Sequence, residues 1–141
     1  MKTIVVLAVS IVLVGILFCP MVMSAPSSMP ADLQIVQPDP SLPKELSAFF
    51  GKYGFTEANF EIFVIVEKIN EEKASVYIWR SGSWPPGTTL GWSRIEAKVI
   101  KENGKYKFWF MGPFGKAEYT LRGEDLVVST PSSTSLLKRV P

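Results

Sequence analysis

Few side chains in this sequence have the types that acid–base, nucleophilic or metal chemistry requires. The 141 residues contain no histidine, and the single cysteine, Cys19, lies in an apolar N-terminal stretch. Catalysis by Ser-His-Asp or Cys-His groups and zinc or copper sites built on histidine are therefore excluded for this sequence. It also contains no glycine-rich nucleotide loop and no EF-hand loop. We expect no cofactor and no bound metal.

Paired carboxylates are the acid–base chemistry that remains, because glycoside hydrolysis can proceed with two of them. Charged residues on expected strands, however, mark the side of the sheet that faces water. A hydrated face explains these carboxylates more simply than an active site does, so a carboxylate-dependent hydrolase is only a third alternative. The candidates are Glu61, Glu67, Glu96 and Glu118.

Three of the four tryptophans gather in residues 78–92, a stretch rich in Gly and Pro. Trp84 precedes Pro85-Pro86, and an aromatic ring held by two prolines loses little entropy when it meets a ligand. Such a ring suits apolar molecules or the CH faces of sugars. Trp79 and Trp92 flank the loop at strand ends, where they either bind the same ligand or fill the mouth of a barrel as core. We expect them to be mostly buried and Trp84 to be exposed on the loop.

The predicted ligand-contacting set adds two aromatic residues from the expected strands. An internal cavity with aromatic walls would favour ligand binding, whereas a fully packed barrel with an exposed apolar edge would favour a structural role. The set is Trp84, Trp79, Trp92, Tyr77 and Phe108, and the last four are the residues whose enclosure of a cavity would favour binding.

Residues 1–25 have the organisation of a secretory signal peptide. Lys2 is followed by an apolar run over residues 3–18, and Ser24-Ala25 supply a small-residue exit. We expect cleavage directly after this pair and export to the periplasm or the extracellular space. Two alternatives stay open. The apolar stretch is also long enough to anchor an uncleaved chain in a bilayer, and Cys19 would carry the lipid of a lipoprotein.

The 116 residues that follow are nearly neutral. Lys2 is the only charged residue in 1–25, so 14 basic and 13 acidic side chains remain. That balance is too even to indicate nucleic acid as a partner. Membrane contact is expected only through 1–25, if they stay attached. Without a cysteine the exported part forms no internal disulfide, so its stability must come from burial of apolar side chains.

Two segments are expected to precede a β-sheet. Residues 26–41 contain four prolines, which predicts an extended linker with at most a short edge strand at 33–36. Pro43 suits the first turn of a helix, and Gly51 suits its end. Apolar residues at helical spacing then predict one short helix over 42–51, with a core-facing stripe of Leu46, Phe49, Phe50 and Tyr53.

From residue 60 onward the pattern is that of β-strands joined by tight turns. Residues 60–69 are a long apolar run, 74–79 are rich in β-branched and aromatic residues, and 92–100 alternate between apolar and charged. Asn103-Gly104 is a strong hairpin signal. Further strands are expected at 106–110, 117–121, 126–129 and 134–140.

A meander of this kind with one apolar face must close on itself or be covered. We therefore predict a mainly β fold for residues 42–141: a small antiparallel up-and-down barrel with the short helix over one end. The alternation also predicts which side chains point inward. They are Ile62, Val64, Val66, Val76, Ile78, Ile95, Ala97, Val99, Phe108, Tyr119 and Leu121.

Several of these strands carry a recognisable pattern. It consists of Val-Ile-Val-Glu-Lys-Ile at 64–69, Ala-Ser-Val-Tyr-Ile-Trp at 74–79, Gly-Trp-Ser-Arg at 91–94 and Tyr-Thr-Leu-Arg-Gly-Glu-Asp-Leu at 119–126. The chain thereby resembles, over roughly 42–130, a family of uncharacterised small secreted bacterial domains with lipocalin-like, or calycin-like, barrels. The resemblance implies the barrel and export, and it implies no catalytic residue. Arg80 and Tyr53 stand where such relatives usually carry Gly and Trp.

Two functional hypotheses follow from these observations. The first is an exported, non-enzymatic domain that binds an apolar small molecule or a cell-envelope glycan at the Trp84 end of the barrel. The alternative is a structural or protein-interaction domain of the cell envelope without a small-molecule site.

Overall fold

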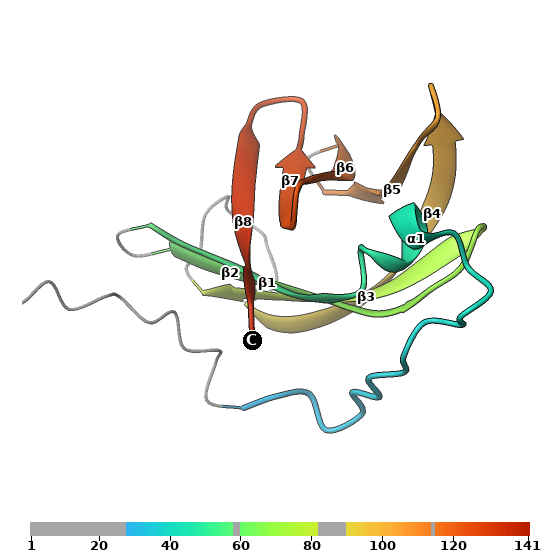
Figure 1. Cartoon of the computed structure of the whole chain (residues 1–141). Coiled ribbons are helices and arrows are strands. Elements are labelled where there is room, and N and C mark those ends of the chain that lie inside the picture. The colour runs from blue at the N-terminus through green and yellow to red at the C-terminus, as the bar shows by residue number, and fades with distance from the viewer. Residues whose placement is uncertain (1–27, 58–59, 82–89, 114) are drawn as a thin grey trace, which may run out of the picture.

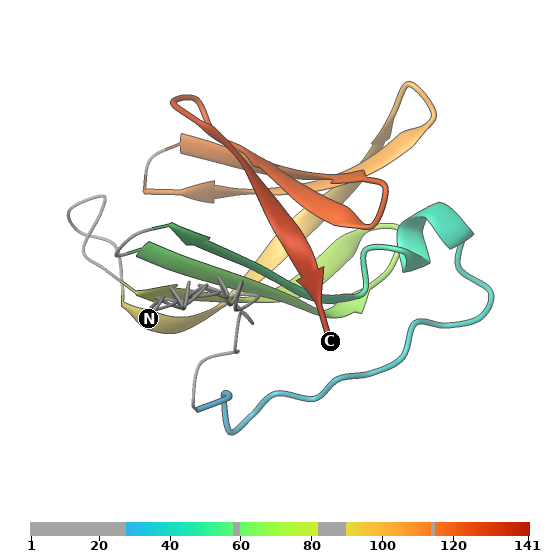
Figure 2. The ribbon, with the colours of Figure 1, turned by 60° about the vertical axis from the view of Figure 1, so that its left-hand side comes forward.

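The chain folds into a closed antiparallel β-barrel (Figures 1 and 2). The computed structural model describes residues 28–57, 60–81, 90–113 and 115–141. In these ranges each strand pairs with its neighbour in sequence, and β1 pairs with β8 to close the barrel. The predicted mainly β, up-and-down barrel is therefore confirmed. The proposed leader, residues 1–25, lies outside the described residues.

Eight strands and one helical turn make up the described part of the fold. Every strand predicted from residue 60 onward is present, and four of them extend one or two residues beyond the expected bounds at each end. The elements are α1 (Lys44–Ser47), β1 (Gly51–Glu57), β2 (Phe60–Ile69), β3 (Lys73–Ser81), β4 (Gly91–Glu102), β5 (Lys105–Gly112), β6 (Gly115–Arg122), β7 (Asp125–Ser129) and β8 (Thr134–Val140).

The helix predicted over 42–51 is wrong in extent, because α1 is a single turn and β1 begins at Gly51. Tyr53, expected on the helix, lies in β1 and pairs with Val64 of β2. Its hydroxyl still reaches the helix and donates to the Phe49 carbonyl over 2.9 Å. Three residues of the stripe, Leu46, Phe49 and Tyr53, are thus buried as expected, and Phe50 is partly buried. The stripe is supplied by two elements of different periodicity and the residues between them, which sequence spacing alone does not distinguish.

Arg139 of β8 explains where α1 stops. Its guanidinium donates to the carbonyl oxygens of Ala48 and Phe50 over 2.6 and 2.9 Å. These carbonyls leave the helical turn without intrahelical partners, and a cation is favourable at that end. Gly51 then adopts φ +144°, a conformation that side chains disfavour, as the chain turns into β1.

Up-and-down order places the strand connections alternately at two ends of the barrel. At one end, the helix end, α1 closes the interior, and Phe49 packs edge-on against Phe108 with ring centroids 5.4 Å apart. At the opposite end, the open end, lie the β1–β2, β3–β4, β5–β6 and β7–β8 connections. All eleven side chains predicted to point inward belong to or pack against one core cluster, which confirms the alternation.

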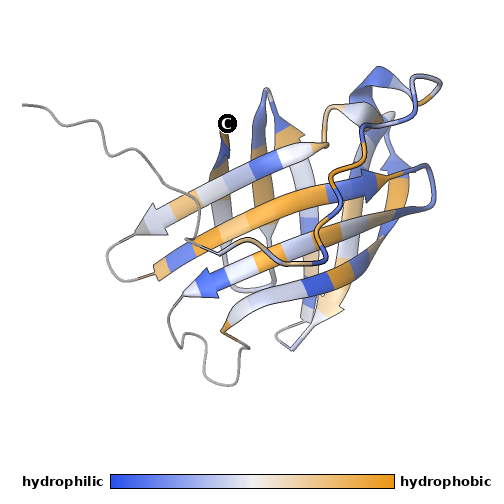
Figure 3. Ribbon diagram, turned by 90° about the horizontal axis from the view of Figure 1, so that it is seen from below, coloured by the Kyte–Doolittle hydropathy of each residue, from blue (hydrophilic) through white to orange (hydrophobic). Residues whose placement is uncertain are grey.

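Residues 28–41, here called the N-terminal strap, cross the outer face of β2–β4 (Figure 3). The Trp92 indole donates to the Ser28 carbonyl over 2.7 Å, and the backbone N–H of Gln34 donates to the Glu67 carboxylate over 3.0 Å. Outward-facing Phe63 and Ile65 of β2 are consequently buried. The segment expected to be a linker therefore lies along the barrel, and its described part forms no strand at 33–36.

Glu67 was expected to face water, and this is wrong, because its side chain is only 1% exposed. The ladder between β2 and β3 shifts register between Val66 and Lys68, which makes Glu67 the extra residue of a bulge. Its carboxylate accepts from Gln34 N, Ser75 Oγ (2.8 Å) and Arg94 Nη2 (2.9 Å). Residues far apart in sequence thus satisfy a buried charge that sequence alone placed in solvent.

The pKa of Glu67 is set by two opposing effects. Burial raises it, because a charged carboxylate is less favourable away from water. The hydrogen bonds from Gln34, Ser75 and Arg94, together with the Arg94 charge, outweigh burial and hold the pKa below its usual range. Ionised Glu67 therefore ties the strap to β3 and β4.

We expect Val99→Ala to lower the free energy of unfolding by about 1–3 kcal/mol, because it removes two methyl groups from a buried inward position. Urea unfolding followed by circular dichroism measures the change. Lys98→Ala, at the adjacent exposed position of β4, is the control and should stay within about 0.5 kcal/mol of the wild type. Equal effects at both positions would contradict the inward assignment of Val99.

We expect Glu67→Gln to lower the free energy of unfolding by about 1–3 kcal/mol at pH 7. A folded-state pKa below the unfolded value of about 4.3 means that ionised Glu67 stabilises the fold fully above that pH. This contribution is lost as pH falls from there through the lower folded-state pKa, so the two proteins should converge in acid. Urea unfolding between pH 7 and pH 3 measures the difference.

Glu96→Gln is the matched control for this experiment. Glu96 also lies on the outer face and pairs with Lys73 over 3.1 Å, but its side chain is 70% exposed. Solvent screening makes such a pair worth little, so the variant should differ from the wild type by less than about 1 kcal/mol. A constant gap between wild type and Glu67→Gln across the pH range would show that the Glu67 charge does not stabilise the fold.

Candidate functional site at the open end of the barrel

The structure separates the predicted ligand-contacting residues onto two faces of the sheet. Phe108 is fully buried inside the barrel and stacks on Tyr119 with ring centroids 4.7 Å apart. Tyr77 and Trp79 lie on the outer face of β3, and Trp92 on the outer face of β4. These four residues therefore do not line one cavity. Trp84 lies outside the described residues.

Strand alternation explains the positions of the two outer tryptophans. Val76 and Ile78 of β3 belong to the core, so Tyr77 and Trp79 must point the other way. Trp79 pairs directly with Trp92 across the β3–β4 ladder, with ring centroids 5.6 Å apart. Both are mostly but not fully buried, as expected, and neither fills the mouth of the barrel.

Tyr77 is the most enclosed of the outer aromatic residues. The Arg94 guanidinium lies 5.6 Å from its ring centroid on one side. Burial raises the pKa of the Tyr77 hydroxyl, and Asp32 of the strap, near the hydroxyl but outside hydrogen-bonding geometry, acts in the same direction. Covered by the strap, Tyr77 contributes to packing of the outer face.

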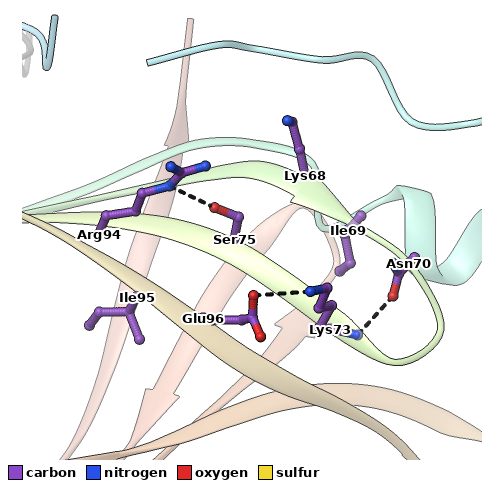
Figure 4. A pocket seen from close by; sticks show the side chains of 8 residues that line it. All are labelled: Lys68, Ile69, Asn70, Lys73, Ser75, Arg94, Ile95 and Glu96. Carbon is purple, nitrogen blue, oxygen red and sulfur yellow. Dashed lines mark hydrogen bonds and ion pairs between the residues drawn. The ribbon is translucent and has the colours of Figure 1, made fainter. Parts of the chain in front are cut away.

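Figure 4 shows a groove of about 530 Å³ on this outer face, next to the β2–β3 turn. It is lined mainly by charged and polar side chains, several of which are paired with one another. Lys73 pairs with Glu96, and Arg94 donates to Ser75 over 3.2 Å as well as to Glu67. Lys68 adds a further, exposed cation to the lining.

The four candidate carboxylates do not converge on a reacting centre. Glu61, Glu67 and Glu96 sit on the outer face of β2–β4, and Glu118 on the outer face of β6. Hydrogen bonds from Lys116 and Lys107 hold the pKa of Glu118 below its usual range. A glycosidase general acid needs the opposite, a raised pKa.

A second hollow, here called the mouth cavity, opens at the open end of the barrel and measures about 570 Å³. Its walls come from β2, β3, β6, β7 and β8. Most of the wall is apolar, formed by inward side chains that include Ile62, Val64, Ile78, Tyr119, Val128 and Leu137.

Differences in side-chain size explain why the cavity forms at this end. Towards the helix end, the interior is filled by the stacked rings of Phe108 and Tyr119 together with Phe49 of the segment that follows α1. Towards the open end, the inward positions include small residues such as Ala117 and Ser135, and α1 lies at the far end. The barrel is thus packed at one end and hollow at the other.

The rim of the mouth cavity carries its polar groups. The β7–β8 turn contributes Thr130, Ser132 and Ser133, and Thr130 Oγ1 lies 3.0 Å from the Ser133 hydroxyl and accepts the Ser133 amide over 3.1 Å. These contacts fix the shape of the turn. Ser135 adds a further hydroxyl from β8.

Arg80 of β3 is the one charged side chain among the described residues that line the cavity. Burial raises the pKa of the Tyr119 hydroxyl above its usual range, and the Arg80 charge acts in the opposite direction. The guanidinium and the phenol therefore influence each other across the same cavity.

Sequence reasoning missed this site, although its signal was available. Positions 76, 78 and 80 of β3 alternate inward, so Arg80 is a cation in an apolar register. The site predicted from the tryptophans at 79 and 92 lies on the opposite, outer face of β3 and β4. The contribution of β7 and β8 to the cavity required knowing that the barrel closes.

Two further kinds of site were examined within the described ranges. No group of three or more Asp, Glu, His or Cys side chains there is arranged to hold a metal ion. No helix in that part of the chain is long and apolar enough to cross a membrane.

Comparison with known proteins identifies no relative. No protein-family model matches the chain, and neither a curated protein nor a solved structure matches it. The resemblance to secreted bacterial lipocalin-like domains thus remains a prediction from the residues.

Proposed function

We propose that this protein is an exported, non-enzymatic binding domain that holds an apolar small molecule in the mouth cavity. The observation that carries the proposal is a cavity of about 570 Å³ with mostly apolar walls and a polar rim. Ligand pockets for small molecules commonly measure about 300–1,000 Å³ and combine apolar walls with a few polar groups that orient the ligand.

The wall chemistry favours one of the two ligand classes expected from the sequence. Aliphatic side chains such as Ile62, Ile78 and Leu137 offer no hydrogen bonds to the many hydroxyls of a glycan. An apolar molecule loses nothing by entering such a space and gains from leaving water. The glycan therefore ranks below an apolar ligand.

Two further observations support other parts of the proposal, the first the absence of catalysis and the second export. Glu67 and Glu118 are held ionised by cations on the outer face, away from the cavity. The sequence of 1–25 supports export, because it has the basic start, apolar middle and small-residue exit of a signal peptide.

A structural or protein-interaction role is the alternative. Exposed apolar residues of the strap favour it, since Ile35 is 53% and Val36 is 46% exposed. This role makes no use of the mouth cavity, so ligand binding separates the two proposals.

We expect Ala117→Phe to weaken binding of an apolar probe at least 10-fold, because the added ring fills the mouth cavity. The uncharged fluorophore N-phenyl-1-naphthylamine is a suitable probe, read by its emission on titration. Thr120→Phe on the outer face of the same strand is the control and should bind like the wild type. Unfolding in urea checks that both variants remain folded.

A wild-type protein that does not enhance the emission of this probe would contradict binding in the mouth cavity. Equal affinity of Ala117→Phe and Thr120→Phe would place the bound probe elsewhere. Ser135→Phe provides a second cavity-filling change, from β8, if Ala117→Phe unfolds.

We expect Trp84→Ala to weaken probe binding by about 1–2 kcal/mol while leaving the melting temperature unchanged. The described ends of its connection, Ser81 and Leu90, lie at the open end of the barrel, so the connection starts and finishes beside the cavity. Fluorescence titration and thermal unfolding give the two readouts. A lowered melting temperature with unaltered affinity would mean that Trp84 stabilises the fold and does not contact the ligand.

A further inference from the structure

The position of Arg80 gives the mouth cavity a polarity from rim to floor. Arg80 is the second-last residue of β3, whereas Ile78, two residues deeper, is only 1% exposed. Two residues of a strand span about 7 Å. A cation therefore stands near the rim, and aliphatic side chains fill the floor beneath it.

The neighbours of Arg80 on the inner face do not neutralise it. Its cross-strand partners are Ile62 of β2 and Gly91 of β4. Among the side chains that the structure describes, no carboxylate lies within ion-pair distance of the guanidinium. The described lining of the cavity contains no Asp or Glu. The net charge of the described cavity lining is thus positive.

The other polar groups near Arg80 can also serve an anion. Ser135 and Tyr119 line the same cavity with hydroxyl groups, each able to donate a hydrogen bond. A guanidinium presents several donors in a fixed fork that fits the oxygens of a carboxylate or phosphate. In a partly desolvated cavity such contacts are stronger than in water.

The outer groove does not offer the same chemistry. Two of its three cations, Lys73 and Arg94, are already paired with carboxylates, and the third, Lys68, is exposed to water. An anion there would lie beside Glu96, which also lines the groove, whereas the described lining of the mouth cavity contains no carboxylate. The mouth cavity is the place where a positive rim and an apolar floor meet.

Building on the proposed function, we propose that the mouth cavity selects a single-chain amphiphile with an anionic head, bound at Arg80 with its hydrocarbon chain toward Ile78 and Leu137. The head remains near the rim, where water can complete its solvation. The chain replaces water on the aliphatic floor. A carboxylate and a phosphate head share this chemistry.

Competition against N-phenyl-1-naphthylamine tests the head-group preference at constant chain length. The competitors are dodecanoate, dodecyl phosphate, dodecanol and dodecylamine, each below its micelle concentration at pH 8. We expect both anions to displace the probe at concentrations at least 10-fold lower than dodecanol, and dodecylamine to be the weakest. The ratio between dodecanoate and dodecyl phosphate distinguishes a carboxylate from a phosphate source.

Arg80→Gln should bring the anions to the level of dodecanol and leave dodecanol itself unchanged. Arg80→Lys, which keeps the charge without the fork, should retain part of the preference. Arg122→Gln is the matched control, because Arg122 is exposed at the helix end of β6 and should not alter any competitor. Added salt should reduce the anion preference of the wild type and not the binding of dodecanol.

The outcomes separate the two proposals. Binding of the probe and of dodecanol, with no anion preference or with a preference that survives in Arg80→Gln, would overturn the head-group inference and leave the binding function standing. Absence of binding by every competitor and by the probe would overturn the binding function itself.

Discussion

Closure of the sheet between β1 and β8 is the constraint on which the rest of this structure depends. Once the barrel is closed, each strand has one face toward a common interior and one face outside. Inward positions from every strand must then fill the same volume. The seam itself is short, because residues 52–54 of β1 pair with residues 138–140 of β8. Arg139 strengthens this seam, because it lies in β8 and binds the carbonyl oxygens at the end of α1.

The inner and outer faces of the barrel are packed in different ways. Inside, large aromatic rings fill the helix end, and smaller side chains leave the mouth cavity at the open end. Outside, apolar residues of β2 and β3 would be exposed if the strap did not cross them (Figure 3). Buried Glu67 at the bulge joins strap and sheet, since it bonds to residues from both. Packing therefore accounts for the aromatic side chains on the outer face. The mouth cavity remains the candidate functional site.

The two hollows differ in their lining. The outer groove is lined mainly by charged and polar side chains, among them the paired Lys73 and Glu96 (Figure 4). The mouth cavity has aliphatic walls and, in its described lining, a single charge at Arg80. Such an arrangement supports the proposed binding of an apolar molecule with an anionic head.

The sequence by itself determined the alternation, and with it the barrel and the eleven inward side chains, because period-two patterning is a local property of each strand. It missed β1, because Tyr53 continues a helical spacing that begins at Leu46. It also placed Glu67 in water and the tryptophans in the barrel mouth. Only the tertiary structure decided these points, since the strap, the bulge and the β1–β8 seam bring together residues far apart in the chain. The mouth cavity is likewise a property of several strands at once, because a hollow arises from what their side chains together fail to fill.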